Sequence, residues 1–341
     1  MSLLSQELQY PVKMAANMTL NNTTPAAGDP LAAWIMIPIT ITTLAANVLL
    51  ITLYAKSSHL HTPFAVYIVS SASGDIAQAF TVHIHSIVTV LSIKWPFGQP
   101  FCTFILYTTW LFVSFSYHMH VLICVNRLWA VMFPAHYRHY HDQKVAIFLV
   151  TGMLVYLNLW ILPGFAIHVM YYAAADGIPV CIPSYPDQLT WSNSTYVALY
   201  IVPESVILVI YPVILIRIYW RTKFHARNRA VRDVTDSTSA QRKSLPSSKQ
   251  NSSGSVSIPF SIKRSRTPRA HFALLTALVL LAVACWTPVS VAYVLVSFEG
   301  LLLYNIMTPC TIVYFLDGLL NPGIFLLASR EWRETMRKKF S

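Results

Sequence analysis

Polar side chains that can do chemistry occur at isolated positions inside long apolar stretches of the chain. Asn47, Asp75 and Asn321 each interrupt such a stretch, and Arg127 closes another. An aspartate at the centre of a bilayer costs about 2.5–3.5 kcal/mol on insertion scales, so residues of this kind are usually paired or functional. Carboxylate and hydroxyl oxygens suit a hard cation. We therefore expect function to reside in these side chains if the apolar stretches cross a membrane.

The apolar stretches have the length and composition of membrane spans. Of the 341 residues, 55% are hydrophobic and only 11% are charged, whereas soluble domains carry about 25% charged residues. A helix needs roughly 20 apolar residues to cross a bilayer, and a barrel strand needs about 10 of alternating polarity. The stretches of helical length are 32–54, 64–91, 100–131, 145–170, 195–220, 271–297 and 302–327. We predict an all-α membrane protein, a seven-transmembrane helix bundle.

Composition and motifs argue against several other classes of protein. The net charge of +11 could suggest nucleic acid, but long stretches of the chain carry none of it. Five cysteines are too few for a disulfide scaffold, and they lack zinc-site spacing. We see no accessible carboxylate pair, nucleophile triad or metal motif that would support an enzyme. The absence of a sequence repeat weakens a transporter hypothesis.

The distribution of basic residues predicts the orientation. Of the 24 Lys and Arg residues, only Lys13 and Lys94 fall on the amino-terminal side of the spans. The positive-inside rule then places the amino terminus outside a multi-pass protein of the plasma membrane. We expect helix one to insert the chain without a cleaved signal peptide. The glycosylation triplets on the outer side begin at Asn17, Asn21, Asn22 and Asn193.

Three regions of the chain follow from this topology. Residues 1–31 form an extracellular glycosylated tail, and residues 32–327 form the bundle. Within the bundle, the cytosolic loop of about 223–269 lacks apolar periodicity and is expected to be disordered. Residues 328–341 are expected to form a short amphipathic eighth helix at the membrane surface and a cytoplasmic tail.

An ordered set of motifs resembles one known family. The motifs are Asn47, Asp75, Asn126–Arg127–Leu128, Cys285–Trp286–Thr287–Pro288 and Asn321–Pro322 followed by Phe325, one set for each span concerned. In this order they resemble the rhodopsin-like (class A) G-protein-coupled receptors, and the resemblance covers nearly the whole chain. Two positions depart from the family's pattern, because Asn126 replaces an acidic residue and Phe325 replaces a tyrosine.

The resemblance implies two structural features. Cys102 and Cys181 would form the family's disulfide, and both lie in the oxidising compartment. The family also holds a sodium ion at mid-bundle, which here implies the residues Asn47, Asp75, Ser116, Asp317 and Asn321. Two carboxylates in low dielectric should not both ionise without a cation. The alternatives are therefore a sodium ion, a shared proton or a hydrogen-bonded cluster that only packs helices.

The resemblance further implies how the inner end would couple to a partner. Arg127 would contact a heterotrimeric G protein, and the neutral Asn126 removes one acidic restraint on it, which predicts raised basal signalling. An alternative is that Asn126 or Tyr211 restrains Arg127 well enough. The other coupling and activation positions are Pro134, Tyr137, Tyr211, Asn321, Pro322 and Phe325. Arrestin and receptor kinases would act on the Ser-rich loop, with Thr335 and Ser341 in the tail. The basic loop ends would contact anionic membrane lipids.

A ligand pocket is implied at the outer half of the bundle. Its residues by position are His85, Thr109, Trp110, Val113, Tyr200, Trp286, Val289, Tyr293, Thr311 and Phe315. Thr109 stands where amine receptors have an aspartate, so we expect a peptide or a neutral, lipophilic small molecule. A decoy or scavenging receptor that binds ligand without coupling is the alternative function. One further hypothesis pairs His118 with Glu204 as a pH switch, against a structural hydrogen bond.

Overall fold

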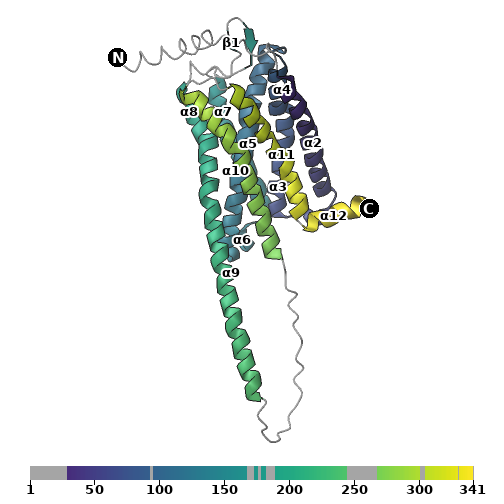
Figure 1. Ribbon diagram of the computed structural model, residues 1–341, viewed down its shortest axis with the longest axis vertical. Coiled ribbons are helices and arrows are strands. Elements are labelled where there is room, and N and C mark those ends of the chain that lie inside the picture. The colour runs from purple at the N-terminus through teal and green to yellow at the C-terminus, as the bar shows by residue number, and fades with distance from the viewer. Residues whose placement is uncertain are drawn as a thin grey trace, which may run out of the picture.

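The computed structural model describes residues 29–92, 95–166, 173–175, 178–181, 189–243, 267–299, 304–328 and 330–340. Most of the amino-terminal tail, with Asn17, Asn21 and Asn22, lies outside the described residues. Within them, six single helices are long and apolar enough to cross a membrane. They belong to α2 (Pro30–Ala55), α5 (Gly98–Met132), α7 (Gln143–Ala166), α9 (Val202–Lys243), α10 (Thr267–Glu299) and α11 (Tyr304–Ala328). Figure 1 shows them packed side by side as a bundle.

The remaining predicted span, 64–91, forms a helix in three consecutive parts. α3 (Pro63–Gln78) passes into a π-helical turn, η2 (Ala79–His83), and continues as α4 (Ile84–Leu91). Thr62 caps α3 by accepting a hydrogen bond from the amide of Ala65, and Pro63 fits the first turn because it has no N–H to satisfy. A π-helical turn inserts one extra residue per turn and often occurs at functional sites. The seven-helix fold class is therefore confirmed, with the second span interrupted.

A second π-helical turn interrupts the fifth span. α8 (Leu189–Tyr196) leads into η3 (Val197–Ile201) and then into α9. Tyr200 in this turn is buried. Each of the two π-helical turns therefore interrupts an otherwise regular helical span.

One end of the bundle carries three short elements. They are η1 (Ser58–Leu60), α6 (Pro134–Tyr140) and α12 (Arg330–Phe340). α12 lies across the same end of the bundle as α6 (Figure 1). Its Trp332 is 4% exposed and packs in a hydrophobic cluster with Leu53 of α2 and Phe325 of α11. The expected amphipathic eighth helix is present, and its apolar side chain docks it on the bundle.

The loop before α8 contains a strand pair, which the all-α prediction did not include. β1 (Ala173–Ala175) pairs antiparallel with β2 (Ile178–Val180), with Ala174 opposite Pro179. Cys181 follows β2 directly and forms a disulfide with Cys102 in the first turns of α5. The implied disulfide is therefore confirmed, and it fastens the strand pair to the amino-terminal end of α5.

The expectation that order ends at residue 223 is wrong for the first part of the loop. α9 continues to Lys243 and projects well beyond the other helices (Figure 1). Residues 221–243 contain no Gly or Pro and include five Arg, three Ala and two Lys residues, which have high helix propensity. A helix already formed in the membrane adds residues without a new nucleation step. Apolar periodicity, the criterion applied to the sequence, does not detect such an extension.

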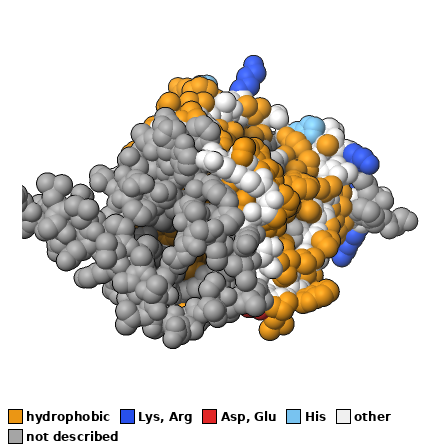
Figure 2. Space-filling view, turned by 90° about the horizontal axis from the view of Figure 1, so that it is seen from above, with side chains coloured by type: hydrophobic (Ala, Val, Ile, Leu, Met, Phe, Trp, Pro, Cys, Tyr) orange, Lys and Arg blue, Asp and Glu red, His pale blue; other side chains and the backbone are white. Residues whose placement is uncertain are grey.

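The outer surface of the bundle is apolar, as lipid contact requires. Trp34, Phe148 and Val209 are 75%, 74% and 67% exposed on three different helices. In the end-on view, hydrophobic side chains cover the visible flanks of the described helices, and Lys and Arg are few there (Figure 2). Buried polar side chains such as Asn47, Asp75 and Asp317 lie inside instead. The described spans thus place their polar side chains toward one another.

Candidate functional site

A glutamine joins three helices at the centre of the bundle. Gln78, at the end of α3, donates a hydrogen bond from Nε2 to Oγ of Ser116 on α5 at 2.6 Å. Its Oε1 accepts a hydrogen bond from the hydroxyl of Tyr314 on α11. All three side chains are buried. Because buried polar groups are costly to leave unpaired, this bridge fixes the spacing of α3, α5 and α11.

Both buried aspartates line one small cavity beside this bridge. Asp75 and Asp317 are 4% and 3% exposed, and each faces a space of about 10 Å³. That space is close to the minimum that holds one water molecule. Gly318 allows the close approach, because a Cβ atom there would lie 3.3 Å from the methyl group of Thr43 and 3.7 Å from Cγ of Asp75. The remaining lining residues are Gln78, His83, Tyr314 and Phe315.

The residues around the aspartates fit a monovalent cation in part. Unpaired buried oxygens include Oδ1 of Asp317, Oδ1 of Asn321 and Oδ1 of Asn47. Within the described residues, no cluster of three or more His, Cys, Asp or Glu side chains suits a metal ion, so a transition-metal centre has no support there. Two carboxylates with orphaned oxygens nearby do suit a hard cation.

Three of the implied sodium ligands do not line the cavity itself. The Ser116 hydroxyl is already hydrogen-bonded to Gln78. The amide of Asn47 donates to the carbonyl oxygens of Thr43 and Gly318, both at 2.9 Å, which ties α2 to α11. Asn321 instead faces Asp317, without hydrogen-bond geometry. The structure therefore brings Asp75 and Asp317 together and gives Ser116 and Asn47 other partners.

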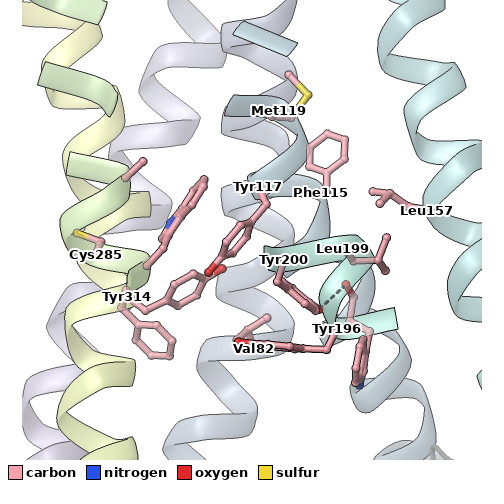
Figure 3. Packing of buried hydrophobic residues seen from close by; sticks show 14 of the residues in the cluster. Val82, Phe115, Tyr117, Met119, Leu157, Tyr196, Leu199, Tyr200, Cys285 and Tyr314 are labelled. Atoms are coloured by element: carbon pink, nitrogen blue, oxygen red, sulfur yellow. Dashed lines mark hydrogen bonds between the residues drawn. The ribbon is translucent and has the colours of Figure 1, made fainter. Parts of the chain in front are cut away.

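Aromatic rings fill the centre of the implied ligand pocket. Tyr117 stacks on Trp286, with ring centroids 4.0 Å apart, and meets Tyr200 edge-on at 5.3 Å. Figure 3 shows Tyr117 of α5 and Tyr200 of η3 close together among the buried aromatic side chains. Tyr196 stacks on Tyr293 of α10 at 4.1 Å. The sequence analysis placed Trp286, Tyr200 and Tyr293 in this pocket, but not Tyr117 or Tyr196.

Hydrogen bonds fix these rings across helices. The hydroxyls of Tyr117 and Ser290 are 3.1 Å apart, and the hydroxyl of Tyr196 donates to the carbonyl of Ser290. The hydroxyl of Tyr200 donates to the carbonyl of Trp110 at 3.3 Å. A ligand that enters this space has to displace or stack on a connected aromatic cluster, not fill an open polar cleft.

The other implied pocket residues have mixed environments. His85 forms a 3.1 Å hydrogen bond with the carbonyl of Cys181, so it holds the outer loop. Phe315 is 1% exposed beneath the ring of His83, 3.6 Å away. Thr311 donates to the carbonyl of Met307 in its own helix. Thr109 has a buried hydroxyl with no hydrogen-bond partner, while Val113 and Val289 pack at the edge of the main hydrophobic cluster.

A separate hollow opens on the flank of the bundle. It has a volume of about 460 Å³ and lies between α10 and α11, with an almost wholly apolar lining. Pro288, Val291 and Ile306 line it, together with Thr287. The hydroxyl of Thr287 donates to Oε1 of Glu204 on α9 at 2.7 Å. The sequence analysis did not predict this hollow, because its residues look like ordinary lipid-facing side chains.

The hypothetical pairing of His118 with Glu204 is wrong. Glu204 accepts its hydrogen bond from Thr287. His118 instead hydrogen-bonds the carbonyl of Ser114 within α5 at 2.9 Å and packs against Tyr156 of α7. The two side chains face different neighbouring helices, so the structural hydrogen bond was the better alternative for each.

Arg127 lies near the carboxy-terminal end of α5 without an acidic partner among the described residues. Its Cζ lies 3.7 Å from the ring centroid of Phe64. The titratable group acting on it is Tyr137. Asn126 is 4% exposed, and both polar atoms of its side chain lack hydrogen-bond partners. The expected loss of an acidic restraint is consistent with these contacts, while the role of Phe64 was not predicted.

The other coupling positions surround this end. Pro134 begins α6, and Tyr137 of that helix stacks on His141 at 4.6 Å. Tyr211 of α9 faces Thr276 of α10. Pro322 and Phe325 are buried on α11. The structure thus places these coupling positions on α6, α9 and α11.

One glycosylation triplet can be placed. Asn193 lies within α8 and is half-buried, while Thr195, the third residue of its triplet, is 0% exposed. A predicted phosphorylation site is also buried: Thr335 on α12 is 4% exposed and lies 2.8 Å from Nε2 of His59. Folding hides both hydroxyls, which the sequence pattern could not show.

The comparisons with known proteins agree with this architecture. A family model described as "7 transmembrane receptor (rhodopsin family)" matches residues 46–325. Trace amine-associated receptor 2 of Rattus norvegicus is 31% identical over 196 residues, which are 54% of this chain and 55% of that receptor. The Homo sapiens histamine H1 receptor is 28% identical over 148 residues, 43% of this chain and 30% of that receptor.

The chain thus spans about half the length, or less, of these relatives. Both relatives are named as receptors, and neither is named as an enzyme. The family match covers all seven spans except the first part of α2 and the last residues of α11. The chain belongs to the rhodopsin family of seven-transmembrane receptors.

Proposed function

We propose that this protein is a plasma-membrane receptor in which an extracellular ligand shifts the helix bundle toward a state that activates a heterotrimeric G protein. The amino terminus lies outside in this proposal. The family match supports a receptor in general, and the excess of Lys and Arg at the end with α6 and α12 supports that end as cytosolic. The disulfide and strand pair then lie on the outer side.

The observation that carries the proposal is the placement of Arg127. It stands about 25 residues after Cys102 on the same helix, which is roughly 37 Å at 1.5 Å per residue. It therefore lies near the opposite end of the membrane from the disulfide. Its Nε has no hydrogen-bond partner. A guanidinium with free donors suits carbonyl or carboxylate groups of a docking partner.

Raised basal activity belongs to the same proposal. A charge-assisted hydrogen bond is worth about 1.5–3 kcal/mol in general, and Arg127 has no carboxylate partner among the described residues. The resting state then lacks one interaction that would stabilise it relative to the active state. A ligand needs correspondingly less differential affinity to shift it.

The proposed ligand is a peptide, or a neutral, lipophilic small molecule. The relatives are named for trace amines and for histamine, but Thr109 puts a hydroxyl, not a carboxylate, at the position where amine receptors have an aspartate. That hydroxyl is buried and free to hydrogen-bond. The neighbouring Trp110 and Tyr200 offer aromatic faces, which favour apolar or aromatic groups.

Recruitment of a panel of G proteins, with and without peptide and lipid pools, tests the proposal. We expect at least one G-protein class to be recruited above cells lacking the receptor. Arg127→Ala should abolish this signal at matched surface expression. Lys144→Ala serves as the matched control, because Lys144 is exposed at the start of α7. Full recruitment by Arg127→Ala would overturn the proposed role of Arg127.

A decoy or scavenging receptor remains the second candidate, favoured by one specific observation. Phe325 replaces the family's tyrosine, and it is 4% exposed within a hydrophobic cluster, so it offers no hydroxyl to an activation network. Uptake of a labelled ligand with no recruitment of any G protein would support this function. Recruitment of a G protein without ligand would exclude it.

The proposed allosteric group is a sodium ion, with no further cofactor. Asp75 and Asp317 would hold it, since they share one cavity, and Asn321 faces Asp317. A bound sodium ion would offset one of the two negative charges that the carboxylates carry when both are ionised. Gln78 holds Ser116 and Tyr314 in place around them. A proton shared by the two carboxylates is the alternative.

Desensitisation partners are proposed for the loop, not for the last helix. Arrestin and receptor kinases would act on the serines of 237–257, of which Ser237 and Ser239 lie in α9 and the others lie outside the described residues. Thr335 is buried against His59, so a kinase would first have to undock α12. Anionic lipids would contact the exposed basic side chains of α9 and α12, such as Arg221, Arg337 and Lys338.

A further inference from the structure

The contact that covers Arg127 is aromatic. Its Cζ lies 3.7 Å from the centroid of the Phe64 ring, well within the roughly 6 Å over which a cation is attracted to an aromatic face. Among the described residues the titratable group acting on Arg127 is Tyr137, not a carboxylate. The Phe64 ring is thus the closest stabilising partner that the structure gives to this cation.

The residue next to Arg127 cannot take over that task. Asn126 is neutral and 4% exposed, and its Nδ2 and Oδ1 have no hydrogen-bond partners. The Nε of Arg127 is likewise buried without a partner. No charge-assisted bond therefore competes with the aromatic contact in the described part of the chain.

Phe64 is itself held in a fixed position. The turn before α3 ends in Thr62, whose hydroxyl caps the helix at the amide of Ala65, 3.2 Å away, and Pro63 sets the first turn. Leu60 anchors that turn at 1% exposure. The Phe64 side chain packs against both hydrophobic clusters of the protein. A ring fixed in this way can orient a flexible guanidinium instead of following it.

We propose that Phe64 is a positioning residue that holds Arg127 in the resting state by a cation–π contact, in place of an acidic restraint. The inference rests on the proposed G-protein function for its physiological meaning, but the contact can be measured without a G protein. Loss of the aromatic face frees Arg127 and shifts the bundle toward the active state. A cation–π contact away from water changes such an equilibrium by roughly five- to thirtyfold.

Replacement of Phe64 by fluorinated phenylalanines tests the electrostatic part of the contact. Each added fluorine withdraws charge from the ring face while the side chain keeps nearly the same shape. We expect basal activity to rise stepwise from Phe through mono-, di- and trifluoro-Phe. Phe64→Leu should raise basal activity to the level of trifluoro-Phe, and Phe64→Tyr should keep it at the parental level. The same series at Phe148, which is 74% exposed on α7, is the matched control and should leave basal activity unchanged.

A second readout separates this inference from the proposed function. A fluorophore on Trp220→Cys reports the environment at the cytosolic part of α9, where Trp220 is 61% exposed. A graded spectral shift along the Phe64 series, with no recruitment of any G protein, would support the contact and refute coupling. Coupling with no graded response in either readout would overturn the role of Phe64. If there is neither a graded spectral shift nor recruitment of a G protein, both the role of Phe64 and the proposed G-protein function are overturned.

Discussion

Gln78 donates a hydrogen bond from Nε2 to Oγ of Ser116, with 2.6 Å between the two atoms. The same side chain accepts a hydrogen bond from Tyr314, so one amide links α3, α5 and α11. Its neighbours Asp75 and Asp317 face the small cavity on the same side. The glutamine therefore stabilises the walls of the cavity that the aspartates share.

Gln78→Leu is expected to destabilise the receptor. The change leaves the buried hydroxyls of Ser116 and Tyr314 without their partner, and each unpaired buried group costs about 1–3 kcal/mol. The thermal unfolding midpoint of the purified receptor in detergent should fall. Ser73→Ala is the control on the same helix, because the Ser73 hydroxyl bonds only the carbonyl of Val69 in an exposed position. An equal fall for both variants would show that the Gln78 bridge contributes nothing specific.

Sodium is expected to stabilise the receptor through Asp75 and Asp317. A ligand that binds the folded state raises its stability by mass action. Replacing sodium chloride by choline chloride at equal ionic strength should lower the thermal midpoint of the parent protein. Asp75→Asn and Asp317→Asn should each remove that difference.

Asp142→Asn provides the control for the sodium prediction. Asp142 caps α7 by accepting a hydrogen bond from the amide of Val145 at 2.8 Å, far from the cavity lining. This variant should keep the full response to sodium. If sodium does not stabilise the parent protein at all, the shared proton becomes the better account of the two carboxylates.

Gly74→Ala is expected to disturb the packing of α3 on α5. A Cβ atom at position 74 would lie 2.6 Å from Cδ1 of Phe115, whose ring is 5% exposed and cannot move away freely. Overpacking of this kind costs typically 1–3 kcal/mol. Surface expression and thermal midpoint should both fall. Gly152→Ala is the matched control, because nothing lies within 4 Å of a Cβ atom there.

The sequence predicted the features that depend on composition and spacing along one helix. The spans, the disulfide between Cys102 and Cys181 and the eighth helix follow from apolar length, from the family resemblance and from amphipathic pattern. Contacts between helices were harder to predict from the sequence, because they depend on the rotation of each helix about its axis and on its depth in the bundle. Phe64 beside Arg127 is an example: 63 positions separate the two residues in the chain, and no local pattern relates them.

A local signal was present for Gln78. It follows Asp75 by three residues, so both share one face of α3, and an amide on that face belonged with the polar cluster. The π-helical turn at Ala79–His83 had no such signal. That turn rotates the residues beyond it, and it places His83 over Phe315, a contact that regular helical spacing does not give.

Asn193 is expected to remain unglycosylated, contrary to the prediction from its triplet. Asn193 begins the apolar segment of the fifth span, and Thr195 is fully buried. A transferase needs the triplet extended and away from the membrane. Asn193→Gln should leave the mobility of the receptor on denaturing gels unchanged, with or without glycosidase. Asn22→Gln in the tail is the comparison and should remove glycan mass, whereas a shift for Asn193→Gln would refute this expectation.

Acid is expected to destabilise the loop between α6 and α7 through His141. Its ring lies 3.0 Å from the hydroxyl of Tyr67 and is 8% exposed. Burial lowers the pKa of His141 below its ordinary value of 6.5, against the opposing effects of Asp142 and a backbone hydrogen bond.

The unfolded chain therefore binds a proton at position 141 more readily than the folded one does. Stability falls as the pH drops below about 6.5 toward the lower folded-state pKa, and it does not change with this group at higher pH. The thermal midpoint should drop between pH 7.5 and pH 5.5, and His141→Phe should reduce that drop. His139→Phe, at an exposed position on α6, should not. If His141→Phe loses as much stability over this range as the parent protein, protonation of His141 does not contribute to the acid sensitivity of the loop.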